Sequence, residues 1–381
     1  MHDLELHQHL IGRQGSRGAL NTPVLLVELD ALDRNIAAMA DFAAEWGVAL
    51  RPHAKTHKSV EIARRQIAKG AAGSCCAKLG EAEALADGGI ESLLITSPVV
   101  GAAAIERVVR LNNRVGDLMV TADNPANVHA LDAEVRGFGG RPLGVVVDID
   151  PGFHRTGVAT PKDAEALARL IADLPGLTFA GVQFYCGADQ HIEGFEERRA
   201  TIVQRTAYLS SIIERLRAAA LPPAIVTGSG TGTHVIDAML GVFTEFQVGS
   251  YVFMDSQYAA CDLTGDGAAP FETALMVDAR VVSASHPGLA TVDAGLKAFA
   301  TEAGPPRILS GAVAGSRFRF TGDEHGAVVA PTGAAAPGLG QVVTFAAPHC
   351  DPTVNLYDAY HVVRGDTLVD IWPIQARGRS R

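Results

Sequence analysis

The sequence LGVVVDID, residues 143–150, followed after a helical stretch by FAGVQFYCG, residues 179–187, contains the pattern that decides the fold. Residues 144–147 are nearly all apolar, which is typical of a strand covered on both faces. Between the two runs, residues 161–172 carry apolar side chains three and four positions apart, as in an amphipathic helix. A strand, a helix and a second strand in this order predict a parallel strand pair.

The same alternation of strand and helix recurs toward both ends of the chain. Eight β-rich runs are present, at residues 48–55, 73–79, 92–98, 118–123, 143–150, 179–187, 225–233 and 245–251. Eight strand–helix units in roughly 200–250 residues match the size of a closed (β/α)8 TIM barrel, and a doubly wound open sheet is the main alternative. The count of eight favours the barrel, so we expect an α/β fold with this barrel over residues 22–265.

The pattern of residue types along the sequence changes after the last of these runs. Long helical patterns end, and short strand-like runs separated by Gly/Pro turns appear at residues 273–284, 290–294, 317–321, 341–346 and 360–363. This pattern predicts an additional C-terminal antiparallel β domain over residues 266–381. The early run at residues 23–29 precedes the first helix and is a candidate extra strand of that domain.

Composition and charge exclude several classes of protein. Lys plus Arg is 32 and Asp plus Glu is 42 in 381 residues, so the formal charge of −10 argues against a general nucleic-acid binder. The chain has no run of 18 apolar residues and no basic-then-apolar leader at its start, which argues against a membrane span and against secretion. Its five cysteines are sparse and odd in number, which fits reduced thiols in the cytoplasm.

Two glycine-rich stretches follow the last two predicted barrel strands, GSGTGT at residues 228–233 and GSY at residues 249–251. In a barrel the carboxyl ends of the last two strands are the usual phosphate position. Glycine lets backbone N–H groups approach an anion, and the hydroxyls of Thr231, Thr233 and Ser250 add donors. One such loop alone is better read as a tight turn, but two on adjacent strands predict a phosphate site. No GxxxxGK[ST] motif is present, which excludes a nucleotide P-loop.

The first barrel strand ends in RPHAKTHK, residues 51–58. Strand alternation places Lys55 in the barrel mouth, where a lysine is costly unless it is paired or used in chemistry. Desolvation is expected to lower its pKa and make it a nucleophile that forms a Schiff base. Beside a monophosphate site, such a lysine points to pyridoxal phosphate. Lys58 is interpreted as a solvated loop residue.

A candidate metal pair lies in the second domain, in PHCDPT at residues 348–353. In an extended segment, residues two apart share a face, so His349 and Asp351 can reach one metal ion. A nitrogen and a carboxylate oxygen suit Mn, Mg, Co or Zn, and the carboxylate favours the harder ions. Cys350 would point the other way and pack. The H-x-D pattern on its own is usually structural.

Taken together, these motifs resemble those of the D-threonine aldolase and D-3-hydroxyaspartate aldolase family. These are fold-type III pyridoxal phosphate enzymes related to alanine racemase and to eukaryotic-type D-serine dehydratase. The motifs are RPHAKTHK, DIDPGFHRTGV at residues 148–158, GSGTGT, GSYVFMD at 249–255, DAGLKA at 293–298, DEHG at 323–326 and HCDPTVNLYD at 349–358. The resemblance extends from about Thr22 over nearly the whole chain, and it implies a metal held on the β domain facing the barrel mouth.

The resemblance also implies roles for individual residues. Lys55 matches the Schiff-base lysine, His349 and Asp351 match the metal pair, and His191 matches a histidine that takes the substrate hydroxyl proton. Arg155 matches the arginine near the phenolic oxygen of the cofactor, and Tyr185 matches an active-site tyrosine. The residues that match the phosphate cradle are Thr231, Gly232, Thr233, Gly249, Ser250 and Tyr251.

The implied function is that of a metal-dependent carbon–carbon lyase, which cleaves D-threonine and related D-3-hydroxy amino acids to glycine and an aldehyde. Manganese is the expected metal, and a homodimer is the expected assembly. D-3-Hydroxyaspartate aldolase and dehydratase activities are close alternatives. D-Serine dehydratases carry a cysteine at the second metal position, so Asp351 favours the aldolase. A non-catalytic pyridoxal-phosphate-binding protein would not need a second domain with a metal pair, and a racemase would need a second base instead. Departures at Ala77, Ser97–Pro98 and Cys186 leave the substrate side chain open.

Overall fold

Eight parallel strands, one for each β-rich run, form a barrel in the computed structural model, which describes residues 3–381. The hydrogen-bonded order is β2-β9-β8-β7-β6-β5-β4-β3. A parallel bridge between His53 and Cys75, with the Cys75 N–H donating to Pro52 O at 2.9 Å, closes the ring between β2 and β3. The bounds are β2 (Ala49–Leu50), β3 (Ser74–Cys76), β4 (Ser92–Ile95), β5 (Asp117–Ala122), β6 (Leu143–Ile149), β7 (Leu177–Phe184), β8 (Ile225–Gly228) and β9 (Glu245–Phe246).

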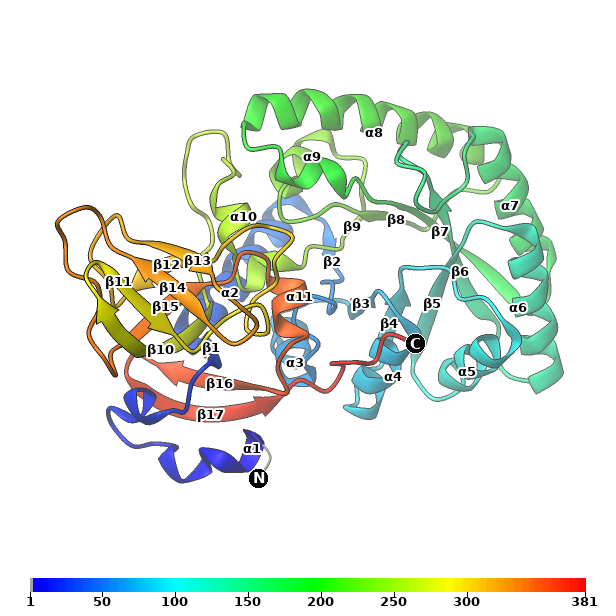
Figure 1. The fold of residues 1–381 in the computed structure, drawn as a ribbon. Helices are drawn as coiled ribbons and strands as arrows, with labels where there is room; N and C mark the ends of the chain where they lie inside the picture. Colours follow the sequence, from blue (N-terminus) through cyan, green and yellow to red (C-terminus); the bar gives the residue numbers. More distant parts are fainter. Residues whose placement is uncertain (1–2) are drawn as a thin grey trace.

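Helices alternate with these strands and cover the outside of the barrel (Figure 1). They are α2 (Leu29–Trp46), α3 (Val60–Ala68), α4 (Leu79–Asp87), α5 (Ala102–Asn112), α6 (Pro125–Phe138), α7 (Pro161–Asp173), α8 (Phe195–Ala218) and α9 (His234–Leu240). Helix α7 illustrates why these segments form helices. Thr160 accepts the Asp163 N–H at 3.1 Å, Pro161 opens the first turn, and one face with Leu167 and Ile171 is buried.

The second domain is a nine-stranded, mostly antiparallel sheet with the path β13-β14-β11-β10-β1-β16-β17, to which β12 and β15 add through β10. Its strands are β1 (Val24–Glu28), β10 (Leu275–His286), β11 (Leu289–Val292), β12 (Arg307–Ser310), β13 (Arg317–Phe320), β14 (Gly326–Val329), β15 (Val342–Ala346), β16 (Ala359–Arg364) and β17 (Thr367–Pro373). The early strand β1 lies inside this sheet, antiparallel to β10 and parallel to β16. The predicted barrel with an added β domain is therefore confirmed.

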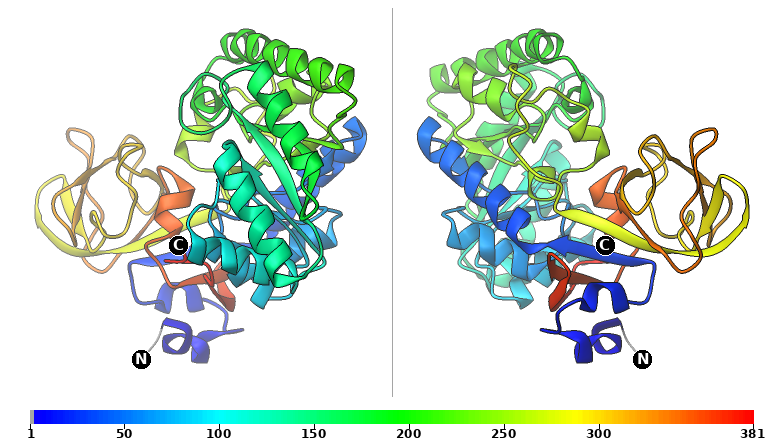
Figure 2. Two further views of the ribbon diagram at one scale, coloured as in Figure 1. Left: turned by 90° about the vertical axis from the view of Figure 1, so that its right-hand side faces the viewer. Right: turned by 90° about the vertical axis from the view of Figure 1, so that its left-hand side faces the viewer.

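The β domain has an aromatic core of its own. The ring centroids of Phe318 and Phe345 lie 5.3 Å apart, and those of Phe299 and Phe345 lie 5.6 Å apart, both in edge-to-face geometry. The N-terminal elements, α1 (Asp3–Leu6), η1 (Gln8–Leu10) and η2 (Ser16–Ala19), pack on the side of the sheet formed by β17 (Figure 2). Between residues 3 and 381, no helix has both the length and the apolar character needed to cross a membrane.

Specific hydrogen bonds attach the β domain to the barrel mouth. The Tyr360 hydroxyl donates to His57 O at 2.6 Å, and the Ser256 N–H donates to Ala347 O at 3.0 Å. As a result, the short helix α11 (Cys350–Val354) lies between the sheet and the barrel (Figure 1).

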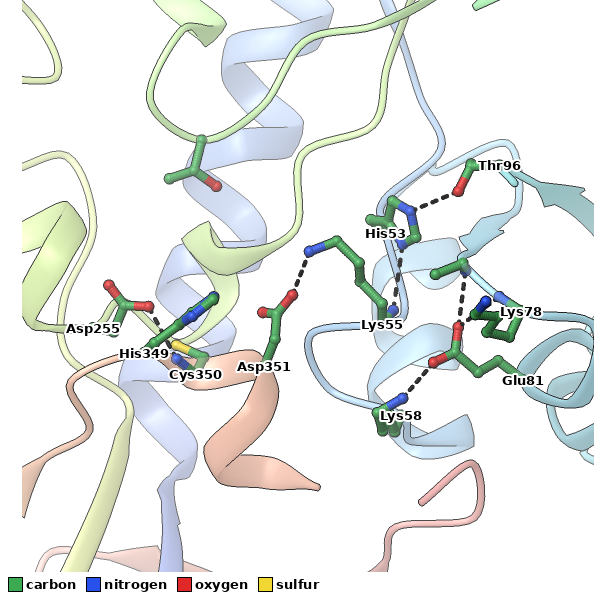
Figure 3. Close-up of polar contacts among 12 residues, drawn as sticks. His53, Lys55, Lys58, Lys78, Glu81, Thr96, Asp255, His349, Cys350 and Asp351 are labelled. Carbon is green, nitrogen blue, oxygen red and sulfur yellow. Dashed lines mark hydrogen bonds and ion pairs between the residues drawn. The ribbon is translucent and has the colours of Figure 1, made fainter. Parts of the chain in front are cut away.

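The structure overturns the interpretation of Lys58 as a solvated loop residue. Lys58 is only 8% exposed, has a left-handed φ of 51°, and pairs with the buried carboxylate of Glu81 (Figure 3). The other carboxylate oxygen of Glu81 accepts the N–H groups of Ala77 and Lys78 at 2.8 and 3.2 Å. The sequence around Lys58 is polar, but the barrel wall and α4 cover it.

Replacing Lys58 with methionine is expected to lower the free energy of unfolding by about 3–5 kcal/mol, because the substitution leaves the Glu81 carboxylate buried without a cation. Urea denaturation followed by circular dichroism measures the change. Adding Glu81→Gln to Lys58→Met removes the orphaned charge and should restore most of the loss, whereas Lys69→Met at an exposed position serves as the control. A loss in the single variant that matches the control would contradict the buried pair.

Candidate active site

A cavity of about 450 Å³ opens at the carboxyl ends of the barrel strands. Residues from seven of the eight strand ends line it: His53, Lys55, Ala77, Lys78, Thr96, Ser97, Pro98, Val100, Asp123, Arg155, Thr156, Gln183, Tyr185 and Gln247. A smaller adjoining cavity shares Lys55, Tyr185 and Gln247 and reaches the two glycine-rich loops. The predicted lysine and the predicted phosphate loops therefore meet at one place.

Lys55 lies at this mouth on a turn, and not on a strand as the alternation pattern predicted. Strand β2 ends at Leu50, and the chain from Ala54 to His57 is a turn. Burial acts to lower the pKa of Lys55, but the adjacent carboxylate of Asp351 outweighs burial and raises that pKa above its ordinary value. The expected lowering of the lysine pKa is therefore wrong for the protein alone, since the counter-ion comes from the other domain.

The two glycine-rich loops form the small cavity together. Thr231, Gly249 and Ser250 line it, and the Thr231 hydroxyl oxygen accepts the Tyr251 N–H at 2.9 Å, which joins one loop to the other. A Cβ on Gly249 would lie 2.7 Å from the hydroxyl oxygen of Thr56, so a larger residue there would have to displace the Thr56 side chain. That Thr56 hydroxyl is buried, and Thr56 also lines the small cavity. A cradle of hydroxyls and close backbone fits a phosphate group.

Three other residues predicted for the phosphate cradle have partners away from the small cavity. The Gly232 N–H donates to Gln190 Oε1 at 3.0 Å, and the Thr233 hydroxyl donates to Asp237 at 2.6 Å. The Tyr251 hydroxyl accepts a hydrogen bond from Gln66 at 3.0 Å. Gly232, Thr233 and Tyr251 thus hold the loops in shape and are not among the residues that line the cavity.

Arg155 and Tyr185 both line the larger cavity and lie next to each other. The guanidinium carbon of Arg155 is 5.6 Å from the centre of the Tyr185 ring, within the range of a cation–π contact. The loop after β6 is ordered by Asp150, whose Oδ1 accepts the N–H groups of Gly152 and Phe153 at 2.8 and 2.9 Å. The D-x-D-x-G motif therefore positions the arginine.

His349 and Asp351 come from the β domain, but not from an extended strand as predicted. His349 has extended backbone and directly precedes α11, and Asp351 lies in the first helical turn. The Cys350 N–H donates to Asp255 Oδ2 at 3.0 Å, which anchors α11 to the barrel. Asp351 then extends toward Lys55 and forms an ion pair with it (Figure 3). Burial opposes ionisation of Asp351, but the Lys55 ammonium holds the pKa of the carboxyl far below its ordinary value.

His191 lies in the short helix η3 (Ala188–His191), and its ring centroid is 4.4 Å from that of Tyr258. Tyr258 lines the small cavity, so this ring contact places His191 directly behind the cavity wall and not among the residues that line it. Burial lowers the pKa of His191. Its Nε2 atom is buried without a partner in the described chain, as is Oδ1 of Asp351.

Sequence reasoning missed several residues of the site. Tyr258 lines the small cavity, three positions after the family motif that ends at Asp255. Gln183 and Gln247 form an amide pair at 3.1 Å on the cavity wall, and polar residues in otherwise apolar strand ends are the signal that could have identified them. Lys78 also lines the larger cavity.

The residues present fit a hard divalent cation with few protein ligands. The described part of the chain contains no cluster of three or more His, Cys, Asp or Glu side chains able to hold a metal. His349 and Asp351, two positions apart at the start of α11, are the residues that would hold the cation. Manganese and magnesium accept such sites because water and substrate oxygens complete their coordination. The unpartnered Oδ1 of Asp351 is available for that role.

Comparison with known proteins places this fold and site in a class. Residues 27–257 match the family model described as alanine racemase, N-terminal domain, and residues 274–363 match the model described as putative serine dehydratase domain. The lysine-bearing barrel and the β domain are those of the alanine racemase-like class, whose members are fold-type III pyridoxal phosphate enzymes.

Individual relatives narrow the class further. The chain is 41% identical to D-threonine aldolase of Arthrobacter sp over 95% of its own length and 94% of the relative's. It is 37% identical to 3-hydroxy-D-aspartate aldolase of Paracoccus denitrificans (strain Pd 1222), with 95% and 93% covered. The crystal structure of D-threonine aldolase from Filomicrobium marinum matches with a TM-score of 0.91 and 38% identity over 95% of this chain and 97% of that one. The chain belongs to the family of D-threonine aldolases and 3-hydroxy-D-aspartate aldolases, which are lyases.

Proposed function

We propose that this protein is a metal-dependent pyridoxal phosphate lyase that cleaves D-threonine and related D-3-hydroxy amino acids to glycine and an aldehyde. One observation carries the proposal: Lys55 of the barrel and Asp351 of the β domain meet at the mouth of the cavity that the two glycine-rich loops border. A lysine side chain, an anion cradle and a carboxylate able to bind a metal are thereby within reach of one small substrate.

The barrel residues hold and orient the cofactor in this proposal. Lys55 would hold the cofactor covalently, and the hydroxyls of Thr231 and Ser250 with the backbone at Gly249 would hold its phosphate. Arg155, beside the Tyr185 ring, would stabilise its phenolic oxygen. Bound pyridoxal phosphate supplies an electron sink for the carbanion that carbon–carbon cleavage leaves, and a divalent cation supplies a Lewis acid for the substrate hydroxyl.

The residues of the second domain and of η3 act on the substrate hydroxyl. His349 and Asp351 hold the cation, which we propose to be manganese, with magnesium, cobalt and zinc as alternatives. His191, with a pKa below its ordinary value, is neutral at physiological pH and accepts the hydroxyl proton at its unpartnered Nε2.

Two other reactions use the same groups. Cleavage of D-3-hydroxyaspartate to glycine and glyoxylate follows the same steps, and the similarity to 3-hydroxy-D-aspartate aldolase supports it. Dehydration to a keto acid is supported by the match of residues 274–363 to a serine dehydratase domain. The harder carboxylate of Asp351, in place of a thiolate, favours the aldolase.

One assay distinguishes these reactions, as well as a racemase and a non-catalytic binding protein. The purified protein, loaded with pyridoxal phosphate and Mn²⁺, is given D-threonine or D-3-hydroxyaspartate. We expect acetaldehyde and glycine from D-threonine. Accumulation of 2-oxobutanoate would identify a dehydratase, L-threonine a racemase, and unchanged substrate a binding protein. Glyoxylate from D-3-hydroxyaspartate, in the absence of acetaldehyde from D-threonine, would favour the second aldolase activity.

Removing the metal is expected to abolish cleavage and to leave the cofactor bound. The reason is that His349 and Asp351 lie at the start of α11 in the β domain, whereas the phosphate loops belong to the barrel. Treatment with EDTA followed by desalting should remove acetaldehyde release and retain the visible absorbance of the cofactor. Added Mn²⁺ should restore the rate. Full turnover by a protein shown by elemental analysis to be metal-free would disprove the metal dependence.

We also propose that the protein acts as a cytoplasmic homodimer on a small-molecule substrate. All five cysteines are unpaired, which fits a reducing compartment. The dimer follows from the resemblance to enzymes that build their sites at a subunit interface. Sedimentation equilibrium of the cofactor-loaded protein should report twice the chain mass.

A further inference from the structure

The imidazole of His349 has a partner outside the residues already assigned to the site. Its Nδ1 lies 2.7 Å from Oε1 of Glu302, a residue 47 positions earlier in the chain. Glu302 belongs to the connection between β11 and β12 of the β domain. This contact joins a carboxylate to the ring nitrogen of His349 on the opposite side from Nε2.

The two ring nitrogens of histidine have different roles when the residue binds a metal. A hydrogen bond from Nδ1–H to a carboxylate fixes the tautomer in which Nε2 carries the free lone pair. It also fixes the ring orientation and raises the basicity of the coordinating nitrogen. A Glu302–His349 pair in this geometry leaves Nε2 as the coordinating atom.

We propose that Glu302 is a positioning residue that holds His349 in the tautomer and orientation needed to bind the cation. This inference rests on the metal site of the proposed function. Two separate contacts then prepare the ligand pair: Asp255 fixes the backbone at Cys350, and Glu302 fixes the ring of His349.

The exposure of the pair separates a positioning role from a structural one. The Glu302 side chain is 55% exposed and that of His349 is 27% exposed. Ion pairs of this exposure contribute little to folding stability. Loss of the Glu302 carboxylate should therefore leave the fold and the barrel cofactor site unchanged and appear as weaker metal binding.

The test measures Mn²⁺ affinity directly, without turnover. The pyridoxal-phosphate-loaded wild type, Glu302→Ala and Glu302→Gln are each titrated with Mn²⁺, and free Mn²⁺ is followed by its electron paramagnetic resonance signal. Glu302→Ala should raise the Kd about 10–100-fold, the usual effect of removing a carboxylate behind a metal-binding histidine. Glu302→Gln, whose amide oxygen still accepts from Nδ1–H, should have a smaller effect. Glu324→Gln, an exposed carboxylate of the same domain that pairs with Lys297, is the matched control and should bind like wild type.

The outcomes separate this inference from the proposed function. If wild type binds no Mn²⁺, or if His349→Ala binds it as wild type does, the metal site itself is wrong and the positioning role fails with it. If His349→Ala loses binding but Glu302→Ala stays within twofold of wild type, only the role of Glu302 is overturned. If Glu302→Ala loses binding as completely as Asp351→Ala, Glu302 is a direct ligand, which also overturns a positioning role.

Discussion

Replacing Lys55 with alanine is expected to abolish both the visible absorbance of the bound cofactor and the cleavage of D-threonine. Lys55 is the lysine that the two cavities at the barrel mouth share, so it is the amine placed to bind the cofactor covalently beside the phosphate loops. Removing the nucleophile of a covalent site prevents formation of the attached form. Absorbance spectra of the reconstituted variant and an acetaldehyde assay measure the two losses.

The Lys55→Ala result needs a control for folding, because Asp351 loses its counter-ion. Lys55→Arg keeps a cation beside Asp351 but cannot form the covalent bond, so it should lose absorbance and activity equally while circular dichroism stays unchanged. Lys78→Ala, at a second lysine that lines the larger cavity, should retain the absorbance. Borohydride reduction followed by mass spectrometry identifies the labelled residue, and a label on Lys78 would refute the assignment.

Replacing His191 with alanine is expected to lower kcat for D-threonine by at least ~10²-fold, since loss of one general base typically costs about 10²–10⁴. The reason is its position: Nε2 is buried without a partner in the described chain, and the ring packs against Tyr258, which lines the small cavity together with Lys55. Cofactor absorbance and Mn²⁺ affinity should stay at wild-type values. Exchange of the glycine α-proton does not need a hydroxyl base and should survive much better. Cleavage at near wild-type rate would show that the hydroxyl proton goes elsewhere.

The pH dependence gives a second signature of His191. Burial lowers the pKa of this histidine below its ordinary value of 6.5, so the ring stays neutral, and able to accept a proton, to lower pH than a free histidine. Activity should therefore be lost as pH falls through this lowered pKa, which places the acid limb of kcat/KM below pH 6.5 in the wild type. In His191→Ala that limb should change its position or disappear, whereas an identical limb in both proteins would assign it to another group.

Much of the architecture was readable in the sequence because it depends on local patterns. Buried runs such as LGVVVDID form strands wherever both faces are covered, and eight of them separated by helices close into a barrel. Lys55 was identifiable because a lysine at a strand end beside two glycine-rich loops has few other uses. The runs at β12, β14 and β17 were missed; β12 and β17 mix polar with apolar residues and so carry little periodic signal.

Only the tertiary structure decided which charged side chains of the site pair with each other and how they are oriented. Lys55 and Asp351 are 296 positions apart, so nothing in the local sequence could show that a carboxylate raises the lysine pKa instead of burial lowering it. The same holds for Lys58, whose buried partner Glu81 belongs to α4. The sequence by itself determined the main candidates for the chemistry, since motif spacing along one chain is a local property. Their protonation, orientation and supporting contacts follow from charges and hydrogen bonds that arise only when the barrel and the β domain pack together.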